Sequence, residues 1–168
     1  MAADRQRDRD RDAVGRPRNT RPRDALGRPL PRDAAGLPSA DDRPLPPPEA
    51  LAAAQHLIDA DRPFHAHEVL EAVWKAAPPA ERDLWQGLAQ VAVGLTHALR
   101  GNSTGAASLL RRGANRLAAY PARGPHDVDV AGLRVSCAEL AAHIERSGPA
   151  GLDPAMSHLR LRAERNGS

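Results

Sequence analysis

The sequence has few aromatic residues, a single cysteine and no long hydrophobic run. Phe, Tyr and Trp make up 2% of its 168 residues, whereas strands of sandwiches and barrels are enriched in aromatic and β-branched residues. Cys137 has no second cysteine to pair with, which excludes an intramolecular disulfide and a cysteine-based zinc site. No apolar run approaches the roughly 18 residues of a transmembrane helix, and the N-terminus lacks the apolar segment of a signal peptide. We therefore expect a cytoplasmic protein with no membrane partner.

Alanine is abundant, and leucine and valine supply most of the larger apolar side chains. Such a composition suits helices that pack closely on small residues, because Ala and Leu favour the helical conformation. After residue 48, apolar residues recur at helical spacing and predict an all-α fold. Pro and Gly divide this region into a compact bundle of about five helices, over residues 49–61, 64–77, 80–100, 103–120 and 130–146.

Residues 1–48 have the composition of a disordered arm. They contain no aromatic residue and mix Arg and Asp densely, so they bury too little apolar surface to offset the entropy of ordering. Eleven Arg and eight Asp lie within residues 1–45, whereas residues 46–168 carry 13 basic and 13 acidic residues. Because the Asp residues weaken the field that attracts phosphates, a solvated linker is the simpler interpretation. The alternative is an arm that binds a protein or nucleic-acid partner.

A short motif occurs three times in this arm: RDAVGRP at 11–17, RDALGRP at 23–29 and RDAAGLP at 32–38. The intervals of 12 and 9 residues are too short and too irregular for a solenoid. We expect three parts in the chain. They are the arm over 1–48, a helical domain over 49–147, and a C-terminal tail over 148–168 in which 154–164 forms a short helix.

The stretch FHAHEVLEAVW at 64–74 holds an unusual mixture of side chains. Rotation along a helix divides it into an ordinary apolar stripe and a polar stripe. The polar stripe consists of Phe64, His67, Glu68, Glu71 and Trp74. Carboxylates flanked by large aromatic rings indicate a partly covered face on which polar groups need partners. Because the chain has almost no other large side chains for its core, we expect both Trp74 and Trp85 to be largely buried.

A second polar line lies on the third predicted helix. Gln86, Gln90 and His97 are spaced by 4 and 7 residues and fall within about 40° of one another on a helix. Short connections would make the second and third helices antiparallel neighbours, and this line would then face the polar stripe. Alternatively, it faces water. The first arrangement predicts one coupled polar cluster that includes Glu71 and His97.

Together these motifs resemble the bacterial and archaeal family named domain of unknown function 309. The family pattern is an aromatic or apolar residue, H-E-x-x-E-x-x-W, Q-G-x-x-Q, and a His followed by R-G-N-x-x-G-A. The matching stretches are HEVLEAVW at 67–74, QGLAQ at 86–90, His97 and RGNSTGA at 100–106, within about residues 50–120. The resemblance implies a compact all-α domain and no established activity. The candidate site residues are His67, Glu68, Glu71, Trp74, Gln86, Gln90, His97, Arg100 and Asn102.

Three classes of function fit these residues. The sequence favours a binding or interaction module whose polar seam is a structural network or a small-ligand pocket. A metal-dependent hydrolase is the first alternative: His67 and Glu71 can chelate a divalent metal with His97 as third ligand, although H-E-x-x-E lacks the second histidine of the zincin motif. A nucleic-acid-associated protein that uses the arm is the second. We expect no resident cofactor. The sequence contains no nucleophile motif such as G-x-S-x-G, and whether the protein is an enzyme stays open.

Overall fold

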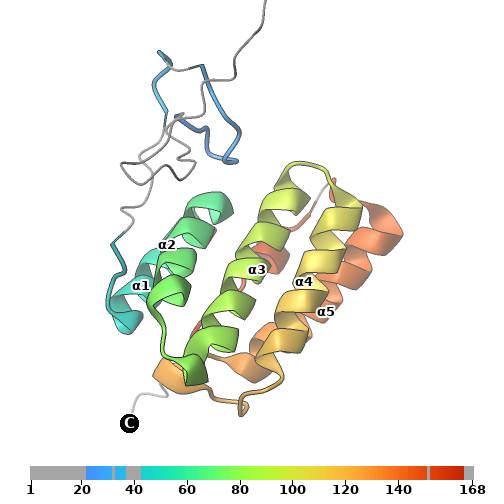
Figure 1. Ribbon diagram of the computed structural model, residues 1–168. Helices are drawn as coiled ribbons and strands as arrows, with labels where there is room; N and C mark the ends of the chain where they lie inside the picture. The colour runs from blue at the N-terminus through green and yellow to red at the C-terminus, as the bar shows by residue number, and fades with distance from the viewer. Residues whose placement is uncertain (1–21, 32, 37–42, 151, 165–168) are drawn as a thin grey trace, which may run out of the picture.

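The structure is a computed structural model that describes residues 22–31, 33–36, 43–150 and 152–164. Five long helices follow one another, and each packs mainly on the next (Figure 1). They are α1 (Pro47–Asp59), α2 (Pro63–Ala76), α3 (Arg82–Leu99), α4 (Ser103–Leu117) and α5 (Val130–Ser147). Two 3-10 turns, at Pro79–Glu81 and Pro125–Asp127, precede α3 and α5, and a short α6 (Pro154–Ser157) follows. The predicted all-α fold is confirmed.

The helix boundaries follow from local residue chemistry. Pro47 and Pro63 lie in the first turns of α1 and α2, where a missing N–H has no intrahelical partner to lose. α3 ends in a Schellman motif: the N–H of Gly101, with φ +81°, donates to Ala98 at 3.1 Å, and that of Asn102 donates to His97 at 2.9 Å. The sequence therefore sets the position of the α3–α4 turn.

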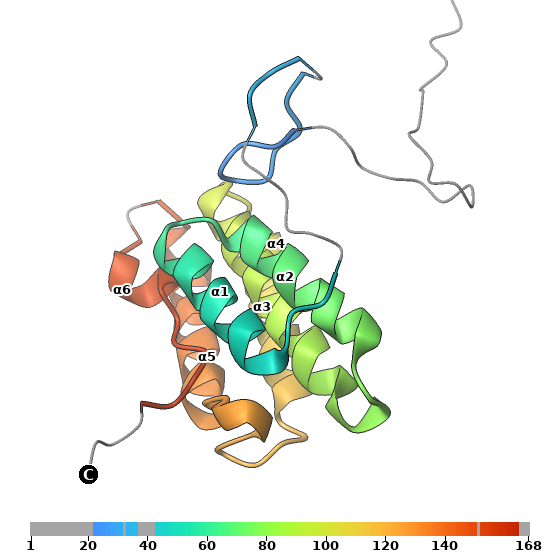
Figure 2. The same ribbon diagram turned by 90° about the vertical axis from the view of Figure 1, so that its left-hand side faces the viewer.

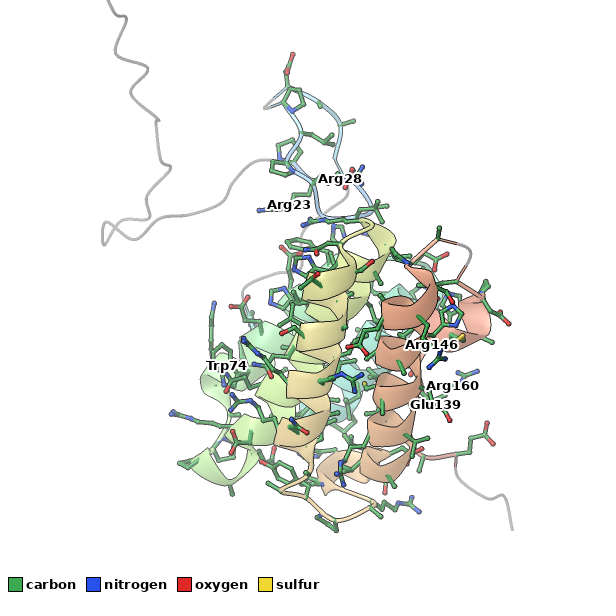
Figure 3. All side chains as sticks on the ribbon, turned by 90° about the vertical axis from the view of Figure 1, so that its right-hand side faces the viewer. Arg23, Arg28, Trp74, Glu139, Arg146 and Arg160 are labelled. Carbon is green, nitrogen blue, oxygen red and sulfur yellow. The ribbon has the colours of Figure 1, made fainter. Side chains whose placement is uncertain are left out.

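One hydrophobic core runs through the whole bundle. The apolar seam of α5 is buried throughout, and burial raises the pKa of the Cys137 thiol to about 12, as expected for an inert, packed cysteine. Trp85 is fully buried. Trp74 is partly buried and packs against this core. It lies on the polar stripe of α2, whereas the small residues of the opposite stripe fill the core (Figure 3).

Glycines bring α3 and α4 unusually close together. A Cβ on Gly113 would lie 2.7 Å from Val91 Cγ2 and 2.8 Å from the carbonyl oxygen of Gly87, and one on Gly94 would lie 2.9 Å from Leu110 Cγ. These separations are shorter than carbon and oxygen atoms tolerate, so side chains larger than hydrogen are excluded at this crossing. A Cβ on Gly87, the glycine of the QGLAQ motif, would lie 3.2 Å from the carbonyl oxygen of Gly113 and 3.2 Å from Leu117 Cγ, so this glycine also favours the close packing.

The C-terminal segment closes the bundle beside α1 and α5 (Figure 2). Gln55 of α1 donates to the carbonyl of Leu159 at 3.0 Å and accepts from the N–H of Leu161 at 2.8 Å. Both leucines are buried in the common core, so part of the segment expected to be a tail packs with the domain. Within the described ranges, no helix has both the length and the apolarity needed to cross a bilayer.

Candidate functional site

The nine candidate residues fall into three groups in the structure. The first runs along α2, where His67 Nε2 lies 3.7 Å from Glu71 Oε2 and Glu71 Oε1 lies 3.5 Å from Lys75 Nζ. Burial lowers the pKa of His67; Glu71 opposes this shift and Lys75 adds to it. Glu68 and Trp74 are half-buried on the same helix. These side chains follow one face of α2 at helical spacing.

The second group joins α3 to α4. Gln90 Oε1 accepts from Arg116 Nε at 3.4 Å, and the same guanidinium donates to Asp83 Oδ1 at 2.7 Å. Gln86 is half-buried one turn earlier on α3. Gln90 also lines a surface depression of about 570 Å³ between these helices. The contacts of Gln90 therefore point toward α4.

The third group, which consists of His97, Arg100 and Asn102, lies at the α3–α4 turn. Asn102 Oδ1 accepts from the N–H of Gly105 at 3.0 Å and caps α4. Its Nδ2 lies 3.0 Å from Nδ1 of His97, an arrangement in which the amide donates and the imidazole carries its proton on Nε2. No hydrogen bond or ion pair between described residues joins His97 to Glu71. Their coupling stays a prediction.

The candidate metal ligands lie at two places in the structure. His67 and Glu71 are neighbours on α2, whereas the ring of His97 contacts Asn102 at the turn. In the part of the chain that the structure describes, no group of three or more His, Cys, Asp or Glu side chains is arranged to hold a metal ion. A cavity of about 620 Å³ between residues 43–47 and the α2–α3 connection is lined by none of the nine candidates.

Residues 23–29, the second copy of the repeated motif, form a tight turn within the arm. Asp24 Oδ1 accepts from the N–H groups of Leu26 at 2.9 Å and Arg28 at 2.8 Å, as in an Asx turn. Gly27 has φ +72°, which glycine adopts without steric cost. Arg23 and Pro29 pair in an antiparallel bridge. The arm residues 1–21, 32 and 37–42 lie outside the described part of the chain.

This turn lies over the end of the bundle where α2 begins and α3 ends (Figures 1 and 3). Arg100 Nε donates to the carbonyl of Leu26 at 2.9 Å. A Cβ on Gly27 would lie 2.1 Å from Phe64 Cγ, so the backbone reaches the ring only because this residue is glycine. The guanidinium carbon of Arg23 lies 4.7 Å from the ring centroid and that of Arg100 5.9 Å from it, within cation–π range. We call this surface of Phe64 and Arg100 the docking site.

A buried histidine underlies the docking site. His65 is 2% exposed, and its ring lies 5.8 Å from that of Phe64 in an edge-to-face arrangement. Neither ring nitrogen has a hydrogen-bond partner among the described residues. Burial lowers the pKa of His65, Arg62 and Arg23 lower it further, and Asp24 opposes them. A neutral ring is therefore favoured here.

Residue patterns identified Phe64 and Arg100 but not what contacts them. Residues 22–31 of the arm form a turn with contacts to α2 and α3, and the disorder of the arm as a whole stays a prediction. Composition averages over the arm and therefore hides one turn that is held by a few specific contacts. The threefold repetition of the motif was the signal that marked this turn.

Residues 51–109 match the family model described as "Domain of unknown function (DUF309)", which confirms the resemblance over this stretch. The uncharacterized protein YpuF of Bacillus subtilis (strain 168) is 46% identical over 48 residues. That alignment spans 28% of this chain and 28% of the relative. No solved structure matches the chain. Neither description names an activity. The family segment includes Phe64 and Arg100, and the turn at 23–29 lies outside it.

Proposed function

We propose that this helical domain is an interaction module that holds a short turn-forming protein segment at the docking site. In this chain, the segment is the turn at 23–29. The observation that carries the proposal is the double contact of this turn: Gly27 packs on the Phe64 ring while Arg100 binds the Leu26 carbonyl. A segment from outside the family region is thus held by side chains from inside it.

The chemistry of these contacts is that of peptide recognition. A guanidinium that donates to a backbone carbonyl accepts any residue at that position, whereas an aromatic face against a glycine selects for the absence of a side chain. The Arg23 guanidinium adds an attraction to the same ring. Together these features recognise a cation, a tight turn and a glycine in one short segment.

The arrangement of the candidate residues supports catalysis less well than it supports the binding of a protein segment. The polar groups lie in three separate sets, whereas general acid–base chemistry needs its groups within reach of one reacting atom. The neutral charge of residues 46–168 supplies no net attraction for phosphates. Our proposal includes a cytoplasmic location and no resident metal, and elemental analysis of the purified protein tests the second point.

The experiment uses the one phenylalanine of the chain. Phenylalanine labelled with ¹³C places a single aromatic probe at Phe64. In the wild-type protein, we expect nuclear Overhauser contacts from Leu26 and Gly27 to this ring. A full-length variant with Gly15, Gly27 and Gly36 all changed to Val is expected to lose them and to show a shifted ring signal, because valine strongly disfavours the positive φ of the turn.

A synthetic peptide of residues 21–31 is then titrated into the triple variant. We expect a saturable return of the Phe64 signal toward its wild-type position. The matched control is the same peptide with Gly27→Val, which should leave the signal in place. If the unmodified peptide at millimolar concentration shifts the ring no further than the control does, the docking site does not bind this segment and the proposal fails.

A further inference from the structure

The three copies of the arm motif share five positions and differ at two. Arg, Asp, Ala, Gly and Pro occur at the same places in each copy, as in Arg23, Asp24, Ala25, Gly27 and Pro29. The fourth position is Val, Leu or Ala, and the sixth is Arg, Arg or Leu. The copy at 23–29 shows what each position contributes.

Four of the shared positions either stabilise the turn or bind it to the docking site. The carboxylate of Asp24 closes the turn on two backbone N–H groups. Gly27 supplies the positive φ and the close approach to the ring. Arg23 contacts the Phe64 ring and donates to the Gly27 carbonyl, and Pro29 pairs with Arg23. Nothing in the structure explains the shared Ala25, whose side chain is exposed.

The two variable positions contribute backbone atoms to the docked turn. Leu26 contributes its carbonyl oxygen to Arg100, and every residue type offers that atom. Arg28 is exposed and takes part in the turn through its backbone groups. Variation in the motif therefore coincides with the positions where the docking site tolerates it.

We propose that the copies at 11–17 and 32–38 are alternative occupants of the same docking site, so that one site is served by three tethered ligands of its own chain. This inference rests on the proposed function. The copies start 12 and 9 residues from Arg23, and an extended chain spans up to about 3.3–3.6 Å per residue. When the copy at 23–29 leaves, the new occupant is tethered to the start of α1 at Pro47. The shorter tether, nine residues from Pro38, spans up to about 30 Å. The 13 residues of α1 are about 20 Å long, so either neighbour reaches the site.

Tethering has a consequence for outside partners. Segments on a short linker act at effective concentrations on the order of millimolar, and three such segments raise the occupied fraction above that of one. A partner protein that presents an Arg-Asp-x-x-Gly turn must displace all three. The arm then inhibits binding of outside partners to the docking site, and this inhibition persists when any single copy of the motif is lost.

The first test is the single variant Gly27→Val in the full-length chain with labelled Phe64. With three equivalent ligands, loss of one leaves the ratio of occupied to empty docking site at about two thirds of its wild-type value. We also expect new contacts to the Phe64 ring from Val14 or Ala35. The control is Arg28→Ala, which changes an exposed and variable position and should leave the ring signal unchanged.

The second test titrates peptides of residues 9–19 and 30–40 into the triple valine variant. Binding within about tenfold of that of peptide 21–31 supports interchangeable copies. Weaker binding by both, together with a Gly27→Val chain whose ring signal already equals that of the triple variant, overturns the inference. That outcome leaves the proposed function intact as long as peptide 21–31 binds, so the two failures are distinguishable.

Discussion

At the scale of single residues, the most informative position is Phe64. Its ring is approached by two guanidinium groups, one from the arm and one from the end of α3. A guanidinium over an aromatic face contributes roughly 0.5–1 kcal/mol at an exposed site. The hydrogen bond from Arg100 adds about 1.5–3 kcal/mol at most for a charged donor. Contacts of this size hold a segment reversibly, as an interaction module requires.

Two histidines near this end of the bundle make stability depend on pH. Burial lowers the pKa of His65 and of His67. In the unfolded chain, a histidine binds its proton as the pH falls through about 6.5, whereas these two bind it only at lower pH when folded. The unfolded state therefore takes up more protons, and the free energy of unfolding falls as the pH drops below about 6.5.

Urea denaturation between pH 8 and pH 5 measures this slope. The variant His65→Leu keeps the apolar volume and removes the proton site, so we expect a flatter slope. His56 is exposed on α1, and His56→Leu serves as the control with the wild-type slope. An unchanged slope in His65→Leu would show that the buried ring does not contribute.

The predicted coupling between Glu71 and His97 is also decided at this scale. Glu71 contacts His67 and Lys75, and His97 contacts Asn102. If the two side chains share one polar cluster, Glu71→Ala and His97→Ala each cost about 1–3 kcal/mol. The double variant then costs clearly less than their sum. Costs that add within about 0.5 kcal/mol would assign the residues to independent groups.

At the scale of elements, the contact between α3 and α4 has the strictest steric requirement, because it leaves no room for a side chain at its glycines. Gly113→Val places a branched side chain where a Cβ alone would lie 2.7 Å from Val91. Overpacking of this kind costs typically 1–3 kcal/mol, and we expect a value at the upper end of that range. The measurement is the free energy of unfolding of the full-length variant in urea.

Ser108→Val on the same helix is the matched control. Ser108 is exposed, so its replacement introduces the same branched residue without a clash and should stay within about 0.5 kcal/mol of the wild type. Equal losses in the two variants would assign the effect to helix propensity and leave the close crossing without support.

The element boundaries were largely predictable because their signals are local. Pro47, Pro63, Gly101 and Asn102 act within a few residues of their own positions. The end of α4 was harder to predict from the sequence, since the helix ends at Leu117 and the predicted end was near Tyr120. Tyr120 instead donates to Ala80 at 2.8 Å and accepts from the N–H of Leu84 at 3.0 Å. These partners are distant in sequence and leave no local signal.

At the scale of the whole molecule, the C-terminal segment completes the core. Leu161 is 1% exposed, and Leu161→Ala is expected to cost roughly 2–5 kcal/mol because it leaves a cavity. Arg160 is exposed, so the neighbouring Arg160→Ala should change stability by less than about 0.5 kcal/mol. Thermal or urea unfolding of the full-length variants measures both. Similar values for the two would mean that the segment does not share the core.

The sequence by itself determined the all-α fold, the five helices, the buried seam of α5 and the resemblance to the family model that residues 51–109 match. These features follow from helical periodicity and from Pro, Gly and Asn at helix ends, which act over a few residues. Only the tertiary structure decided that the polar candidates form three groups and that Gly27 packs against Phe64. The physical reason is that such contacts join segments far apart in the chain, and their geometry depends on how the helices pack.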